Sequence, residues 1–162
     1  MALCERLKQF LAQEKVQYEI LPHPQVFTAQ EVAAQSHVTG WHLAKVVVVR
    51  DEAGGAHMVA IPAPSLLDVA AVQKATGKAK LRIAHEEDFR ALFPDCETGA
   101  MPPFGNLYGV PVYVDAALTR SREFVFQAGN HKEAVRMSYA DYERLAKPVV
   151  GEFAGRAALK PA

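Results

Sequence analysis

The close spacing of strand-like segments is the feature that most limits how this chain can fold. A β-branched run at residues 43–49 is separated from the apolar segment 57–61 by little more than the turn residues 51–55. Two strands this close can form a hairpin, but they leave no room for the helix that usually joins parallel neighbours. The density of apolar residues in the first strand also predicts burial on both of its faces.

Helix-like and strand-like segments alternate along the rest of the chain. Amphipathic or capped helices are predicted over residues 3–11, 28–39, 65–76, 85–93 and 138–146. Further strands are predicted over residues 16–20, 81–83, 110–114, 123–127 and 135–137. Because many of these strands follow one another too closely for helical crossovers, the pattern predicts an α+β fold. Its sheet is expected to be mixed or antiparallel, with helices packed around it.

The composition limits the partners that this chain can have. The 162 residues are half hydrophobic and carry 18 basic and 18 acidic side chains, which fits one domain with a buried core. A protein that grips a long nucleic acid usually has a basic excess, so we expect no DNA partner and at most a local basic patch. The sequence has no apolar run of roughly 20 residues and no signal-peptide core, which predicts a cytoplasmic protein without membrane contact.

No residue pattern predicts a metal or an organic cofactor. The histidines are scattered and show no HxxxH spacing, so a metal site is not expected. The sequence also lacks GxSxG, P-loop and GxGxxG motifs, which disfavours serine hydrolases, NTPases and dinucleotide enzymes. Cys4 and Cys96 show no CxxC spacing and fit reduced thiols. Cys96 could be a nucleophile if His131 lay nearby, or it could be a buried, inert thiol.

The segment 97–105 is a loop rich in glycine and proline. Its glycines permit backbone conformations closed to other residues, and two adjacent prolines stiffen it and have no N–H groups. The amides available before the prolines are those of Gly99, Ala100 and Met101. A rigid loop with uncommitted amides can serve as an oxyanion hole, or it can be a stiff turn between two elements.

Three polar features have both a functional and a structural interpretation. Lys45 shares a strand face with Val47 and Val49, so it is either a fixed cation for a phosphate or oxyanion, or a lysine that extends into water. His131 lies in a polar turn and could donate a hydrogen bond or carry a proton, or it could simply be solvated. The basic cluster within residues 74–82 could contact phosphates or form a solvated helix end.

Four stretches of the sequence together resemble the YbaK/EbsC family, relatives of the editing insertion domain of bacterial prolyl-tRNA synthetase. They are residues 24–31 (PQVFTAQE), 43–48 (LAKVVV), 99–105 (GAMPPFG) and 128–131 (AGNH). The GxxxP pattern at 99–103 and the lysine on the earlier strand are more specific together than either is alone. The resemblance extends from the first helix to Leu145. We therefore expect one domain over residues 1–148 and a C-terminal appendage over residues 149–162.

The resemblance implies a free-standing aminoacyl-tRNA deacylase with a mixed, mostly antiparallel, barrel-like sheet flanked by helices. Such proteins hydrolyse the ester between a wrong amino acid and the 3′ end of a tRNA, often tRNA for proline, without a cofactor. Prolyl-tRNA synthetase is a candidate partner. Val46 stands where some relatives have a polar residue, so alanine, serine, threonine and cysteine all remain candidate amino acids. The alternatives are a non-catalytic binding module of the same fold and a thiol hydrolase.

The family pattern also implies roles for individual residues. Lys45 is expected to approach the terminal nucleotide, while the substrate's own ribose hydroxyl assists the attack of water. The amides expected to surround the reacting ester are those of Gly99, Ala100 and Met101. The residues expected to line the pocket are Phe27, Thr28, Pro103 and His131.

Overall fold

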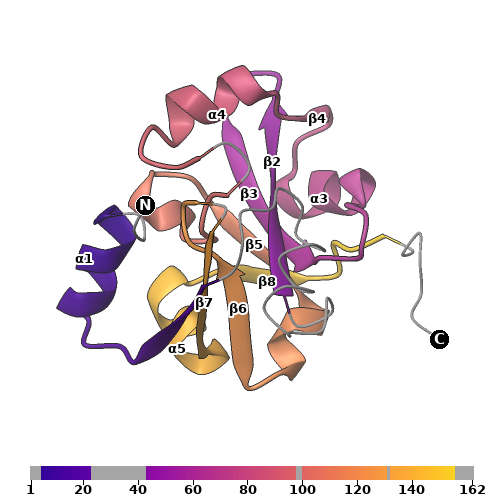
Figure 1. The fold of residues 1–162 in the computed structure, drawn as a ribbon. Coiled ribbons are helices and arrows are strands. Elements are labelled where there is room, and N and C mark those ends of the chain that lie inside the picture. The colour runs from indigo at the N-terminus through magenta and orange to yellow at the C-terminus, as the bar shows by residue number, and fades with distance from the viewer. Residues whose placement is uncertain (1–4, 23–42, 98–99, 131, 156–162) are drawn as a thin grey trace.

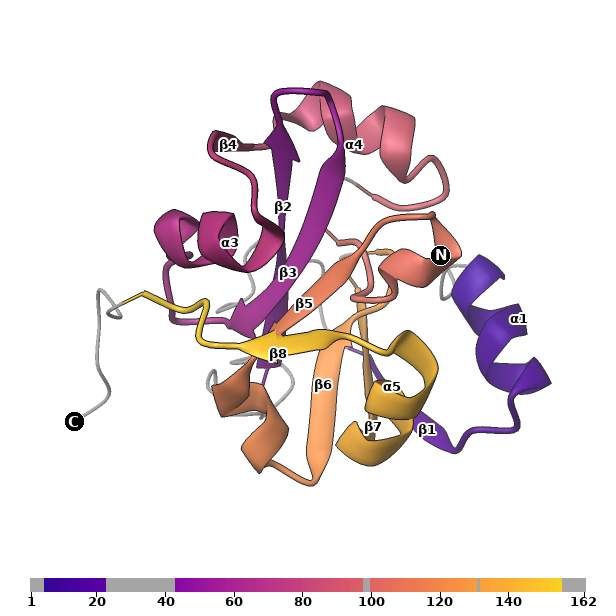
Figure 2. The same cartoon turned by 180° about the vertical axis from the view of Figure 1, so that it is seen from behind.

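A single mixed sheet runs through the molecule, with helices against its faces and ends (Figure 1). The computed structural model describes residues 5–22, 43–97, 100–130 and 132–155. The strands described there have the order β1-β7-β6-β2-β3-β5-β8, and β4 pairs with β2 outside this path. Four pairs are antiparallel and three are parallel, which confirms the predicted mixed, mostly antiparallel α+β fold. Figure 2 shows β8 crossing in front of the central strands, which gives the sheet a curled form.

Most of the predicted strands form within a few residues of their expected bounds. The strands are β1 (Tyr18–Pro22), β2 (Leu43–Asp51), β3 (Ala56–Pro62), β4 (Leu81–Ile83), β5 (Val112–Asp115), β6 (Glu123–Gln127), β7 (Glu133–Ser138) and β8 (Val149–Gly151). The hairpin of β2 and β3 is confirmed. Its turn is closed by the Asp51 side chain, which accepts hydrogen bonds from the N–H groups of Ala53 and Gly55.

Two strands begin two residues later than predicted, for local reasons. The Val16 N–H donates to the Leu11 carbonyl at the end of the first helix, so β1 starts only at Tyr18. Val110 donates to Gly105, and Pro111 has no N–H with which to pair along a neighbouring strand. The strand β5 therefore begins at Val112.

The described α-helices are seven to nine residues long, and a side chain caps the start of two of them. They are α1 (Glu5–Gln13), α3 (Val69–Thr76), α4 (Glu86–Leu92) and α5 (Tyr139–Ala146). Asp68 caps α3, so this helix begins later than residue 65, and Gly77 ends it in the left-handed conformation at φ 74°. Ser138 caps α5, which spans the predicted residues to within one position. The helix predicted over 28–39 lies outside the described residues. No helix in the described part of the chain is long and apolar enough to cross a bilayer.

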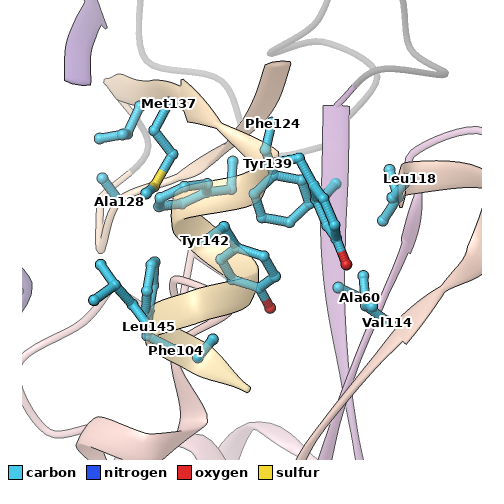
Figure 3. Packing of buried hydrophobic residues seen from close by; sticks show 14 of the residues in the cluster. Ala60, Phe104, Val114, Leu118, Phe124, Ala128, Met137, Tyr139, Tyr142 and Leu145 are labelled. Atoms are coloured by element: carbon cyan, nitrogen blue, oxygen red, sulfur yellow. The ribbon is translucent and has the colours of Figure 1, made fainter. Parts of the chain in front are cut away.

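The main core fixes the end of the loop over residues 97–105, called the GxxxP loop after its pattern at 99–103. Phe104, directly after the loop's prolines, lies edge-to-face against Tyr142 of α5 at 5.1 Å and against Phe126 of β6 at 5.6 Å between ring centroids. The Tyr142 hydroxyl donates to the Pro103 carbonyl at 2.8 Å. Figure 3 shows Phe104 and Tyr142 in the cluster between α5 and the sheet. Burial raises the pKa of Tyr142 well above its usual value, so its hydroxyl stays a donor.

The expected appendage begins with β8, which pairs in parallel with β5. The Asp115 side chain accepts hydrogen bonds from the N–H groups of Phe153 and Ala154, at 2.8 and 2.9 Å. Phe153 is buried against Tyr113. Residues 149–155 are therefore packed on the sheet, and the domain boundary expected at residue 148 stays a prediction.

Candidate functional site

One edge of β2 is interrupted in its middle. On the edge away from β3, β2 pairs with β6 at Leu43 and Ala44 and with β4 from Val49 to Asp51, and Figure 1 shows these two partners at opposite ends of β2. Between these pairs, residues 45–47 have no strand neighbour on this edge among the described residues. They are only partly buried, whereas the residues on either side of them are buried. Lys45 therefore lies, partly buried, in a stretch of β2 that no described strand borders on this edge, called the open stretch of β2 below.

The GxxxP loop lies against the end of β6. The Glu97 N–H donates to the Gly129 carbonyl at 2.8 Å, and the Gly129 N–H donates to the Ala100 carbonyl at 2.8 Å. Gly129 has a φ of 100°, which favours glycine at this position. Met101 belongs to the hydrophobic cluster against which Val46 of β2 packs. The structure thus brings together three stretches that the sequence analysis treated separately: the loop, the turn after β6 and the open stretch of β2.

The loop amides differ in what they bind. The Ala100 N–H donates to the Glu97 carbonyl at 3.0 Å, so this amide is used within the loop's own turn. The Met101 N–H makes no hydrogen bond to the described residues, although Met101 is buried. Gly99 lies outside the described residues. Met101 is therefore the better described candidate for an oxyanion donor, and the donor roles of all three amides stay predictions.

Lys45 follows the last β2–β6 pair and lies on the face opposite Ala44. Ala44 packs in the cluster of Phe104, whereas Leu43, on the Lys45 face, packs with Val125. Burial lowers the pKa of the Lys45 ammonium from its usual value, and Lys45 makes no hydrogen bond or ion pair to a described residue. A partly desolvated cation without a described counter-ion is suited to an anionic ligand.

The surface hollows found among the described residues lie away from the predicted deacylation site. Three surface hollows of about 730, 580 and 650 Å³ lie beside α3, at the tip of the β2–β3 hairpin and along β1 and β7. None of them is lined by Lys45, Ala100 or Met101. The predicted pocket residues Phe27, Thr28 and His131 lie outside the described residues. The predicted pocket residue Pro103 is buried and holds the loop through its bond to Tyr142.

The turn after β6 has a polar framework that sequence reasoning missed. Asn130 is buried, and its side-chain Oδ1 accepts from the Lys132 and Glu133 N–H groups at 2.8 and 2.9 Å. Its amide nitrogen donates to the Glu133 carboxylate at 3.2 Å. Gln127, at the end of β6, is also buried, and its Nε2 has no hydrogen-bond partner. The sequence offered only a weak signal for this feature, a glutamine at the end of an apolar strand.

Cys96 lies in a packed environment near the loop. Its Sγ is 3.3 Å from the Tyr108 hydroxyl, and that hydroxyl donates to the Asp95 carboxylate at 2.9 Å. Phe93 and Met101 belong to one of the clusters that Cys96 contacts. This environment fits a structural thiol, whereas the proposed base His131 lies outside the described residues. Within the described residues no three His, Cys, Asp or Glu side chains form a group that could hold a metal ion.

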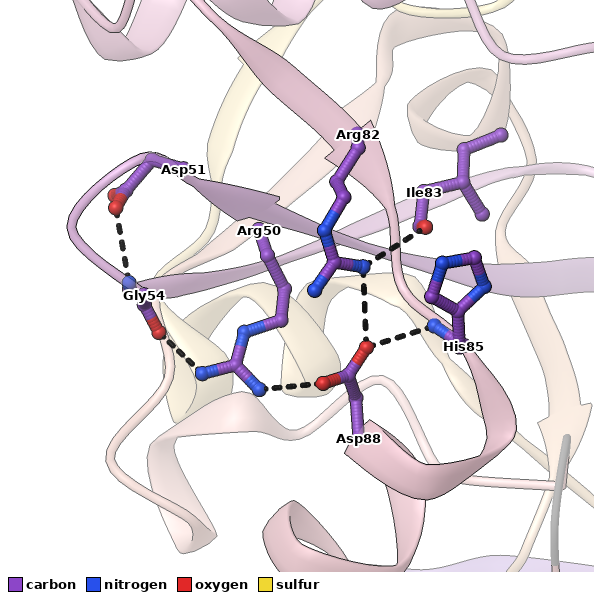
Figure 4. Close-up of polar contacts among 8 residues, drawn as sticks. Arg50, Asp51, Gly54, Arg82, Ile83, His85 and Asp88 are labelled. Carbon is purple, nitrogen blue, oxygen red and sulfur yellow. Dashed lines mark hydrogen bonds and ion pairs between the residues drawn. The ribbon is translucent and has the colours of Figure 1, made fainter.

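The other end of β2 carries a network of paired charges (Figure 4). The Asp88 carboxylate accepts from Arg50 at 2.8 Å, from Arg82 at 3.2 Å and from the His85 N–H at 2.8 Å. The His85 N–H and then the two arginines hold the pKa of Asp88 below its usual value. Next to it, His57 Nε2 lies 3.0 Å from Asp51, and this hydrogen bond is the main cause of the lowered pKa of Asp51.

Comparison with known proteins identifies the domain type. A sequence profile described as the aminoacyl-tRNA editing domain matches residues 23–145. The fold matches the crystal structure of a hypothetical protein with a TM-score of 0.83 and 20% identity over 93% of this chain and 99% of that chain. The crystal structure of a candidate trans-editing enzyme for prolyl-tRNA synthetase also matches, with a TM-score of 0.80 and 22% identity. This match covers 94% of this chain and 97% of that chain.

A candidate signal transduction protein from Marinobacter aquaeolei VT8 also matches, with a TM-score of 0.73 and 19% identity. The match covers 96% of this chain but only 31% of that protein. No curated protein matches the sequence. At these identities the structural matches show the fold alone.

Proposed function

The chain belongs to the aminoacyl-tRNA editing domain family, and from this premise we propose that it is a deacylase that hydrolyses mischarged aminoacyl-tRNA in trans. The proposed substrate is tRNA for proline that carries a small wrong amino acid, and prolyl-tRNA synthetase is the proposed partner. One observation carries the proposal most directly. Paired hydrogen bonds hold the GxxxP loop at the end of β6, and Met101 of this loop packs with Val46, the residue after Lys45 on β2.

The proposed mechanism assigns each described group a separate task. The Lys45 ammonium binds the phosphate of the terminal nucleotide. The bond from Ala100 to Glu97 fixes the turn before Met101, whose N–H stabilises the oxyanion that forms on the ester carbonyl. The ribose hydroxyl of the substrate assists the attacking water. Because the aminoacyl ester is already activated, positioning and electrostatic stabilisation suffice, and no side-chain nucleophile is needed.

Further residues are proposed to shape the pocket that selects the amino acid. They are Phe27, Thr28, Pro103 and His131, whereas the Gly99 N–H is proposed as a further donor to the oxyanion. In editing by size, a site separate from the synthetic site of the synthetase hydrolyses those products that are small enough to enter it. An apolar pocket discriminates against one added methylene by only about 10- to 200-fold, and it rejects an added hydroxyl similarly weakly, so it separates alanine from serine poorly.

A deacylation panel tests the proposed function. Transfer RNA for proline charged with alanine, serine, threonine or cysteine is incubated with the protein, and tRNA charged with proline is the control. We expect at least one mischarged tRNA to be hydrolysed more than about tenfold faster than the correctly charged one. Hydrolysis of all five at the spontaneous rate would exclude a deacylase.

A non-catalytic module that binds the aminoacyl-tRNA end is the second candidate. The half-buried ammonium of Lys45, which has no described counter-ion, suits binding of an anionic nucleotide end whether or not hydrolysis follows. Such a module would bind mischarged tRNA and protect its ester, whereas a deacylase would shorten the lifetime of the ester. The same panel, read together with a binding measurement, separates the two functions.

A further inference from the structure

The open stretch of β2 contains backbone groups that the proposed mechanism does not use. On this edge β2 pairs with β6 at Leu43 and Ala44 and with β4 from Val49 to Asp51. Between these pairs, residues 45–47 border a gap that no described strand fills. At a rise of about 3.3 Å per residue, the gap is about 10 Å long. A backbone N–H or C=O group that points into it is left to bind water or a ligand.

Hydrogen bonds on either side of the gap show which residue points into it. The Leu43 carbonyl accepts from the Ala63 N–H at 2.9 Å, on the β3 side. The Val48 carbonyl accepts from the Ala84 N–H at 2.8 Å, on the β4 side. Along a strand the backbone groups of successive residues alternate between its two edges, so odd positions of β2 face β3 and even positions face the other edge. The N–H and C=O groups of Val46 therefore both point into the gap.

The Val46 backbone is unpaired within the described part of the chain, and solvent reaches its surroundings. Neither its N–H nor its C=O makes a hydrogen bond to a described residue. Residues 45–47 are partly exposed, whereas residues 43–44 and 48–49 are buried. Exposure along β2 thus begins and ends with the loss of the neighbouring strand. A small ligand that enters the gap would find one donor and one acceptor side by side on a single residue.

The bounds of the gap favour a small planar ligand over an added peptide strand. A peptide that extends a sheet pairs along an open edge over several residues. This gap is short, and β6 and β4 close its two ends. The outer edges of β1 and β8 lack a second described partner strand, but they have no such bounds.

Adenine carries the complementary pair of groups. Its N6 amino group donates, and the ring nitrogen beside that group, N1 or N7, accepts. A strand residue with an unpaired N–H and an unpaired C=O can therefore form two hydrogen bonds with one edge of this base. The nucleotide to which a tRNA attaches its amino acid is an adenosine, so the proposed substrate brings this base to the site.

Three directions at one point of β2 suit the three groups attached to the terminal ribose. Val46 packs with Met101 on one face of the sheet, and Lys45, the residue before it, projects from the opposite face. The Val46 peptide groups point along the sheet, into the gap. The ribose carries a phosphate, an aminoacyl ester and a base. With the phosphate at Lys45 and the ester at the Met101 N–H, the gap is left for the base.

We propose that the backbone of Val46 binds the adenine base of the terminal nucleotide, an inference that rests on the proposed function. The Val46 carbonyl accepts from the N6 amino group, and the Val46 N–H donates to the neighbouring ring nitrogen. The side chain of Val46 takes no part in this contact. The preference for adenine is therefore a property of the strand and its gap.

The first test changes the RNA and leaves the protein intact. Two short RNA hairpins with the acceptor-stem sequence are compared, one ending in adenosine and the other in purine riboside, which lacks the amino group. Loss of one hydrogen bond should weaken binding of the purine-riboside RNA to the wild type about three- to tenfold. Equal binding of the two RNAs would overturn the proposal.

The second test changes the protein backbone. Replacing Val46 with the corresponding α-hydroxy acid exchanges its N–H for an oxygen and keeps its side chain. This protein should bind the adenosine-ended RNA about three- to tenfold more weakly than the wild type. Unchanged binding by the folded variant would overturn the proposal. Urea unfolding checks that the variant folds, and if it does not, the comparison of the two RNAs on the wild type decides.

Val46→Ala is the matched control. It shortens the side chain and keeps both backbone groups, so it should retain the preference of the wild type for the adenosine-ended RNA over the purine-riboside RNA. Loss of that preference in the folded variant would overturn the proposal, because the side chain would then make the contact.

The deacylation panel is read separately from these binding measurements. If the wild type prefers the adenosine-ended RNA but hydrolyses none of the charged tRNAs, the deacylase proposal fails and the base contact stands. If it hydrolyses a mischarged tRNA but binds the two RNAs equally, the base contact fails and the deacylase stands. If the wild type does not bind the adenosine-ended RNA, the base contact is overturned.

Discussion

The two ends of β2 both carry charged side chains, but the structure satisfies them differently. At the hairpin end, Arg50 and Asp51 belong to networks in which Asp88 and His57 supply the opposite partners. Near the other end, Lys45 is partly desolvated and makes no ion pair within the described part of the chain. Five residues along one strand thus separate a paired network from a cation without a described counter-ion.

The difference indicates which polar groups hold the fold and which are available to a ligand. Pairing offsets the unfavourable transfer of a charge out of water, so the hairpin network contributes to the folded state. A desolvated lysine or amide without a partner is unfavourable for folding, and functional sites are where such costs are expected. The following predictions test this division.

The largest expected effect is on catalysis by Lys45→Ala. Loss of a charged group that contacts the substrate should lower kcat/KM for mischarged tRNA by about 100- to 1,000-fold. Stability should not fall, because burial already disfavours the charged form of Lys45. Lys8→Ala, at an exposed position on α1, is the matched control and should retain activity within about twofold of the wild type. Near-normal turnover by Lys45→Ala would contradict the claim that the Lys45 end of β2 serves the substrate while the hairpin end serves the fold.

Asp88→Ala should lower stability and leave activity unchanged, the reverse of what is expected for Lys45→Ala. It removes the acceptor shared by Arg50, Arg82 and the His85 N–H, so the urea midpoint should fall. Asp88→Asn keeps an acceptor without the charge and should lie between this variant and the wild type. The kcat/KM of the folded Asp88→Ala protein should stay within about twofold, as for a position outside the site. A large loss of activity in this variant would place the hairpin end within the site.

Acid should destabilise the protein through the same network. Hydrogen bonds from His57 to Asp51 and from the His85 N–H to Asp88 lower the pKa values of these carboxyls in the folded state. Their contribution is therefore fully present above their ordinary pKa of about 4, and it is lost as the pH falls through the lowered folded values. Urea unfolding at pH 6, 4 and 3 should show a falling midpoint. Asp51→Asn should lose less stability over this range, and an equal loss would show that other carboxyls dominate.

The smallest effect is expected for Cys96→Ala. The thiol packs near Tyr108 and Met101 and has no role in the proposed mechanism, so deacylation should stay within about twofold of the wild type. A loss comparable to that of Lys45→Ala would revive the thiol hydrolase and its proposed partner His131.

The fold could be predicted from the sequence where a local rule decided the element. The β2–β3 hairpin followed from strand spacing, and the end of α3 at Gly77 followed from residue type. The parallel pairs could not be predicted, because β2 meets β6 and β5 meets β8 across long stretches of chain. Long-range register depends on the packing of the whole core, which periodicity does not contain.

The candidate site was predicted as separate pieces. Sequence reasoning selected Lys45 and the amides of the GxxxP loop, but it could not show that the loop bonds to Gly129 or that Ala100 uses its own N–H within the turn. It missed Gln127 because a glutamine at a strand end is ordinary until the burial of its amide is known. Such burial depends on neighbouring strands and not on local sequence.

The most direct test of the account is the position of the RNA end on the protein. Backbone amide signals of the isotope-labelled protein are recorded by NMR during titration with the adenosine-ended RNA hairpin. The account predicts shifts at Lys45, Met101 and Gly129, while Arg50 and Gly54 at the hairpin end stay unchanged. Shifts confined to the hairpin end, with Lys45 and Met101 unaffected, would contradict it.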